Sequence, residues 1–129
     1  MKIAVIIVRT LMGLLFIFAS VTYFFDLVPV PEMTGAVKTF NDGLRVAPYF
    51  MPVLKTTELL CGLAFLTGRF VPLATVVIAP IILQIFLFHA FMDKTGLPVA
   101  IFLVAANLFL AYAYRRSYSQ LVEAKPAIS

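Results

Sequence analysis

The sequence predicts an all-α fold, a polytopic integral membrane four-helix bundle with both termini cytoplasmic. Hydrophobic residues make up 63% and charged residues 12% of the chain, whereas soluble domains average roughly 45 to 50% and 25%. The 129 residues hold apolar runs separated by short polar segments, and one membrane-crossing helix needs about 20 residues. We therefore expect one domain, residues 1–129, that crosses the membrane four times.

Residues 3–28 form the first predicted span, and Arg9 is the one charged residue within its apolar part. One face carries polar, small and aromatic residues at helical spacing: Arg9, Gly13, Phe16, Ser20 and Tyr23. Such a face suits the interior of a bundle better than lipid. The run lacks the paired small residues of a signal-peptide cleavage site, so we expect the helix to be retained.

Residues 32–47 are predicted to form a short amphipathic helix in the outer loop. Apolar residues recur there at steps of three and four, and polar residues occupy the other side. This pattern is typical of a helix that lies at the membrane interface or caps the bundle. An ordinary loop is the alternative, because Gly35 and Gly43 lower the helix propensity.

The second predicted span, residues 49–67, contains Lys55 and Glu58. A charge in the hydrocarbon core costs a few kcal/mol or more, so such residues usually face the bundle interior and mark a functional site. The third span covers residues 70–91 and the fourth residues 97–114. Pro80 is expected to bend the third helix near the middle of the membrane.

Basic residues predict the orientation, because they concentrate in cytoplasmic loops. With a cytoplasmic amino terminus, the inner side carries Lys2, Arg69, Arg115, Arg116 and Lys125. The outer side mixes basic with acidic residues: Lys38, Arg45, Lys94, Asp26, Glu32, Asp42 and Asp93. Both termini are then cytoplasmic.

The polar residues of the spans predict an intramembrane pocket. Counting from the helix ends places Lys55, Glu58 and His89 in the outer half of the membrane. Arg9 would reach toward Glu58 from the other side if the first two spans pack together. The candidate pocket therefore consists of Arg9, Lys55, Glu58, His89 and Asn107.

Each pocket residue also has a structural interpretation. Lys55 and Glu58 would neutralise each other, or Lys55 would extend to the outer interface, which we favour. For Glu58, a functional site and a structural ion pair stay open. His89 would pair with Asp93 four residues later. Asn107 is expected to hydrogen-bond between helices.

Other functions find little support in the sequence. No cluster of ligand residues predicts a metal site, and no motif would attach a covalent redox centre. The single cysteine, Cys61, argues against a self-contained thiol-disulfide enzyme and suits packing instead. We expect no nucleic-acid binding, because the positive charge flanks the spans and forms no separate basic surface.

Four stretches of the chain together resemble a known family: VRTLMGLLFIFAS, KTTELLCGLAFLTGRFVPLA, APIILQIFLFHAFMDKTGLP and LAYAYRRSYSQL. They are similar to the DoxX-like family of small four-helix bacterial membrane proteins. Where many relatives carry a glycine and then a polar and a basic residue late in the first helix, this chain has Ser20, Thr22 and Tyr23. The resemblance implies a multi-pass protein of the bacterial cytoplasmic (inner) membrane, and an association with quinone-linked or other membrane oxidoreductase systems.

We therefore expect a small subunit of a quinone-linked or other membrane redox system, and not a self-contained enzyme. Quinone or lipid would bind near Arg9, Glu58 and His89, and a protein partner or a second copy of the chain would complete the system. The alternative is a non-catalytic accessory or assembly subunit of a larger envelope complex. A small transporter or lipid-handling protein is a third hypothesis.

Overall fold

The structure is a computed structural model that describes residues 1–26, 33–125 and 128. Within these ranges the regular structure is entirely helical, which confirms the all-α fold class. The α-helices are α1 (Lys2–Phe25), α2 (Gly35–Val46), α3 (Phe50–Thr67), α4 (Val71–Phe91) and α5 (Leu97–Ala113). Two short 3₁₀ turns, η1 (Lys94–Gly96) and η2 (Arg115–Tyr118), precede and follow α5.

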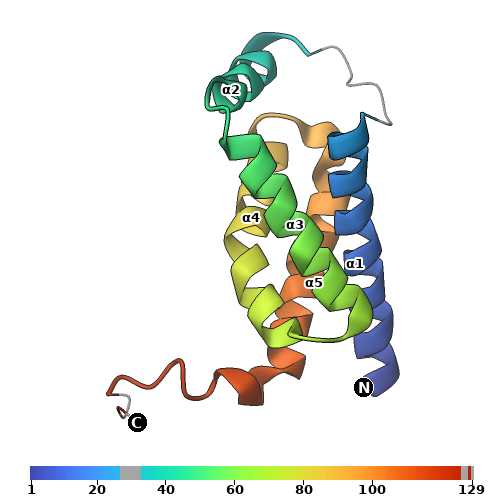
Figure 1. The fold of residues 1–129 in the computed structure, drawn as a ribbon, viewed down its shortest axis with the longest axis vertical. Helices are drawn as coiled ribbons and strands as arrows, with labels where there is room; N and C mark the ends of the chain where they lie inside the picture. Colours follow the sequence, from blue (N-terminus) through green and yellow to red (C-terminus); the bar gives the residue numbers. More distant parts are fainter. Residues whose placement is uncertain (27–32, 126–127, 129) are drawn as a thin grey trace.

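In the described part of the chain, four segments are long and apolar enough to cross a membrane: α1, α3, α4 and Lys94–Ala113, which contains α5. These helices run side by side, and α2 lies across one end of them (Figure 1). We call this end of the bundle the α2 end. The chain enters α1 and leaves α5 at the opposite end, the termini end (Figure 1).

The helices lie where the sequence predicts spans and an amphipathic segment. Residues 27 and 28 of the predicted first span, and residue 32 of the predicted amphipathic segment, lie outside the described residues. The amphipathic segment is helical despite its two glycines. Gly35 has a φ of 65° at the first position of α2, and Gly43 lies within it.

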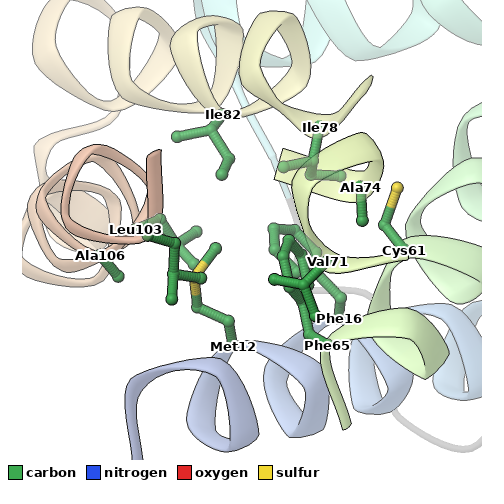
Figure 2. Close-up of a cluster of buried hydrophobic side chains, with 11 residues drawn as sticks. Met12, Phe16, Cys61, Phe65, Val71, Ala74, Ile78, Ile82, Leu103 and Ala106 are labelled. Carbon is green, nitrogen blue, oxygen red and sulfur yellow. The ribbon is translucent and has the colours of Figure 1, made fainter. Parts of the chain in front are cut away.

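The core of the bundle is formed by apolar side chains from all four long helices (Figure 2). Its buried members are Met12, Phe16, Cys61, Phe65, Val71, Ala74, Ile78, Ile82, Leu103, Ala106 and Leu110. Cys61 therefore has the packing role expected of a lone apolar-site cysteine.

Two glycines bring the backbones of α1 and α3 into contact. A Cβ atom placed on Gly13 would lie 2.8 Å from the carbonyl oxygen of Gly62, and one on Gly62 would lie 3.1 Å from the carbonyl oxygen of Gly13. Small residues allow this close approach between membrane helices, where dispersion contacts drive association. The main packing partner of α1 is therefore α3.

Large apolar side chains cover the outward faces of the bundle. Exposed examples are Leu14, Phe18, Leu60, Leu83, Ile101 and Leu108. Continuous apolar surface of this kind is unusual on a soluble monomer, where exposed patches stay within a few hundred Å². Lipid is the environment that these helices require.

Candidate functional site

A cavity of about 820 Å³ opens at the α2 end of the bundle. We call it the main cavity. Its walls come from α1 to α5 and consist mainly of aliphatic and phenyl side chains. Its polar lining residues are Asn41, Tyr49, Lys55, Thr57, Glu58, Gln84 and His89. Three of the five predicted site residues, Lys55, Glu58 and His89, are therefore brought together.

Glu58 lies deep in the wall of the main cavity and is only 4% exposed. Lys55 Nζ lies 3.1 Å from Glu58 Oε2, so the two side chains form an ion pair within α3. The ammonium is not aligned for a hydrogen bond, and Oε2 has no other partner among the described residues. A buried carboxylate oxygen without a hydrogen bond is costly, which makes Glu58 the strongest polar feature of the site.

The favoured prediction for Lys55, an extended side chain at the outer interface, differs from the structure. The side chain turns toward Glu58, and its Nζ also lies 6.0 Å from the centroid of the Tyr23 ring. Compensation of a buried carboxylate outweighs hydration of the ammonium, because an unpaired charge inside the bundle would cost several kcal/mol.

His89 lies in the last turn of α4 and lines the main cavity, and its Nδ1 lies 2.9 Å from the backbone carbonyl oxygen of Asp93. The predicted pairing of His89 with Asp93 is present, but it is made through the backbone carbonyl and not through a hydrogen bond to the carboxylate. That carboxylate instead accepts hydrogen bonds from the Thr95 backbone N–H at 3.1 Å and the Thr95 hydroxyl at 2.6 Å. These bonds hold the pKa of Asp93 below its ordinary value.

The amphipathic helix α2 forms part of the cavity wall. Phe40, Asn41 and Leu44 line the cavity, and the Phe40 ring lies 5.4 Å from the ring of Phe88 on α4. The sequence predicted that this helix could cap the bundle, but it did not predict that α2 supplies residues that line the cavity. The apolar face of residues 32–47 was the sequence feature that indicated this contribution. The sequence did not show that a cavity lies beneath that face.

Arg9 does not belong to the main cavity, which corrects the predicted network with Glu58. Its Nη1 donates to the carbonyl oxygens of Phe65 at 3.0 Å and Leu66 at 3.4 Å. Phe65 lies about two helical turns beyond Glu58. The last carbonyls of a helix lack intrahelical partners and attract cations, so Arg9 caps the end of α3. It also lines a smaller hollow of about 320 Å³ at the termini end, beside Lys2.

Asn107 is buried in α5 at 8% exposure but does not line the main cavity. Its Oδ1 has no hydrogen-bond partner among the described residues. Gln84 on α4, which is not among the predicted site residues, does line the cavity. Within residues 1–26, 33–125 and 128, no three His, Cys, Asp or Glu side chains gather closely enough to hold a metal ion.

Comparison with known proteins identifies one family. Residues 4–90 match the family DoxX, a range that includes all but the first two residues of α1, the whole of α2 and α3, and all but the last residue of α4. No curated protein and no solved structure matches the chain. Because the match spans more than half of the sequence and four helices are long and apolar enough to cross a membrane, the chain belongs to the DoxX family and is a multi-pass membrane protein.

Proposed function

We propose that this protein is a small subunit of a redox system in the bacterial cytoplasmic membrane, and that it binds a quinone-like amphipathic ligand in the main cavity. The observation that carries the proposal is the Glu58 carboxylate, which is buried in the cavity wall with an oxygen that lacks a hydrogen bond. Intramembrane carboxylates are functional candidates by default.

The size and lining of the main cavity support this ligand class. Its volume of about 820 Å³ lies within the roughly 300 to 1,000 Å³ that is usual for small-molecule sites. The apolar walls suit a ring and an alkyl tail, while Glu58 and His89 would meet a polar head group. Such a ligand would reach the cavity from the bilayer in which it dissolves.

The polar groups of the cavity can exchange protons with a ligand but cannot store electrons. Glu58 and His89 are both groups that accept and release a proton. A redox reaction at this site would therefore require a protein partner that carries the electrons. This requirement is why we propose a subunit and not a self-contained enzyme.

Glu58→Gln tests the ligand site, with Leu60→Ala as the matched control. Leu60 lies on the same helix but is 62% exposed on the outward face. The proteins would be reconstituted in lipid nanodiscs and titrated with decylubiquinol. We expect Glu58→Gln to weaken binding about tenfold, because a charge-assisted hydrogen bond is lost, and Leu60→Ala to bind normally.

Equal binding by both variants would contradict the proposed site. Purification from native membranes in mild detergent, followed by mass spectrometry of proteins and lipids, tests the partner. A stoichiometric partner without a bound quinone would favour the accessory or assembly function instead.

A further inference from the structure

The smaller hollow at the termini end, which we call the termini hollow, has the features of a site for an anionic head group. We propose that it binds the phosphate of an anionic phospholipid such as phosphatidylglycerol. It lies at the opposite end of the bundle from the main cavity, so each of the two sites can be tested without the other.

Three helix ends form the termini hollow. The first turns of α1 line it, together with Gly68 after α3 and with Ala113 and Tyr114 at the end of α5 (Figure 1). Its volume is about 320 Å³, at the low end of the roughly 300 to 1,000 Å³ that is usual for small-molecule sites. This volume suits the head group of a lipid and not the whole molecule.

The guanidinium of Arg9, which lines the hollow, has a free edge. Its Nη1 donates to the carbonyl oxygens of Phe65 and Leu66, whereas its Nε and Nη2 have no hydrogen-bond partner among residues 1–26, 33–125 and 128. Nε and Nη2 lie along one edge of the planar group, and such an edge binds two phosphate oxygens at once. Arg9 is also partly buried, so salt screens its charge less than an exposed one.

Lys2 supplies a second cation, closer to the water. It lines the same hollow seven residues before Arg9, which is about 10 Å along the axis of α1. Neither cation forms an ion pair within the part of the chain that the structure describes. A phosphate in the hollow would therefore meet Arg9 from the membrane side and Lys2 from the water side.

The distribution of charge over the bundle favours an anion at this end. The basic residues of the termini end are Lys2, Arg9, Arg69, Arg115, Arg116 and Lys125. Among the described acidic residues, Asp26, Asp42, Glu58 and Asp93 lie at the α2 end or line the main cavity, and only Glu123 lies in the tail after η2. The field of the termini end is therefore positive and attracts an anion from outside the chain.

The apolar surface beside the hollow favours a lipid over a free phosphate ion. Ile6 lines the hollow and is 49% exposed, and Ile7, Leu11 and Leu14 continue the exposed apolar face toward the middle of α1. The acyl chains of a lipid would cover this face. The basic residues predict that the termini end is cytoplasmic, and basic pockets between helices on that side suit anionic head groups.

Native mass spectrometry of the detergent-solubilised protein tests the proposal. Dissociation constants would be measured for phosphatidylglycerol and phosphatidylcholine with the same acyl chains. We expect phosphatidylglycerol to bind about tenfold more tightly, as one bidentate charge-assisted contact would produce. Equal affinities for the two lipids would overturn the proposal.

Three variants locate the site. Arg9→Lys keeps the charge but loses the planar fork, and Lys2→Gln removes a cation from the hollow. Each should weaken the binding of phosphatidylglycerol about fivefold. Arg116→Gln is the matched control, because Arg116 is an exposed basic residue of the same end that does not line the hollow. It should bind phosphatidylglycerol like the wild type.

An equal loss of binding in Lys2→Gln and Arg116→Gln would show that surface charge alone attracts the lipid, and would overturn the proposed site. Because Lys2 is exposed, this comparison holds even where Arg9→Lys fails to fold. Inorganic phosphate and glycerol 1-phosphate distinguish the source of the phosphate. We expect neither to displace phosphatidylglycerol at equal concentration, whereas displacement would assign the hollow to a soluble anion and overturn the lipid.

Discussion

Arg9 owes its position to the place where α3 ends. Its guanidinium donates to the carbonyls of Phe65 and Leu66 and lies against Gly68, where a Cβ atom would approach Nη1 to 2.6 Å. The last turn of α3 is thereby satisfied by a side chain of α1. The long cationic side chain of Arg9 reaches the free carbonyls at the end of α3, and the glycine that follows the helix leaves space for its guanidinium.

We predict that Arg9→Leu destabilises the bundle by about 1 to 3 kcal/mol, because the carbonyls at the end of α3 lose a charged donor. Unfolding in detergent, followed by circular dichroism, measures this loss. Lys2→Gln serves as the control, since Lys2 lines the same hollow and, within the described residues, makes no side-chain hydrogen bond or ion pair with α3. Equal stability of the two variants would show that the cap contributes nothing.

Asp93 and Thr95 give a pH-dependent contribution in the turn before α5. The hydrogen bonds from Thr95 lower the pKa of Asp93 in the folded protein, whereas the unfolded chain has the ordinary value of about 3.9. The contribution is therefore fully present above that value and is lost as the pH falls through the lower folded pKa.

We predict that Thr95→Val lowers stability at neutral pH and that its difference from the wild type shrinks in acid. Melting temperatures of both proteins, measured from about pH 7 down to about pH 2, test this dependence. A difference that stays constant with pH would show that the threonine acts independently of the Asp93 charge.

The pairing of α1 with α3 depends on Gly13 and Gly62, whose backbones nearly touch. We predict that Gly13→Ala costs about 1 to 3 kcal/mol, because the new methyl group would meet backbone atoms of Gly62 and Leu66 that cannot rotate away. Unfolding in detergent measures the loss. Gly43→Ala has free space in α2 and should be neutral or stabilise by up to about 1 kcal/mol.

Hydrophobic patterning predicts the helices of this protein, but it does not predict how far each helix is shifted along the axis of its neighbour. The runs around Arg9 and Glu58 identify two spans correctly, because periodicity and length are local properties. Whether Arg9 meets Glu58 or the end of α3 depends on how far one helix slides along the other. The Gly13 and Gly62 contact sets that offset, and it is a property of two surfaces that neither helix carries alone.

The main cavity is only partly predictable for the same reason. Charged residues inside the apolar runs indicate Lys55, Glu58 and His89, since each violates the local pattern. The contribution of α2 and the exclusion of Asn107 depend on which helix faces are turned together. His89 contacts a backbone carbonyl, which side-chain spacing cannot reveal.

The basic residues of the bundle predict its orientation across the membrane, with the termini end in the cytoplasm. Cysteines introduced at positions 2, 94 and 116, in a Cys61→Ala background, report this with a membrane-impermeant thiol reagent. We expect labelling from outside intact spheroplasts at position 94 alone. Labelling at positions 2 and 116, with none at 94, would reverse the orientation.

The contact between α1 and α3 also has a consequence for biosynthesis. The third helix is the least hydrophobic of the four candidate spans and contains Lys55 and Glu58, so it partitions poorly into lipid on its own. Its main packing partner, α1, emerges from the ribosome earlier and is strongly apolar. We therefore expect α1 to remain near the translocon and to pack against α3 as α3 moves into the bilayer. If the contact between Gly13 and Gly62 is disrupted, α3 should insert poorly and the nascent chain should stall or be degraded before α4 is synthesised.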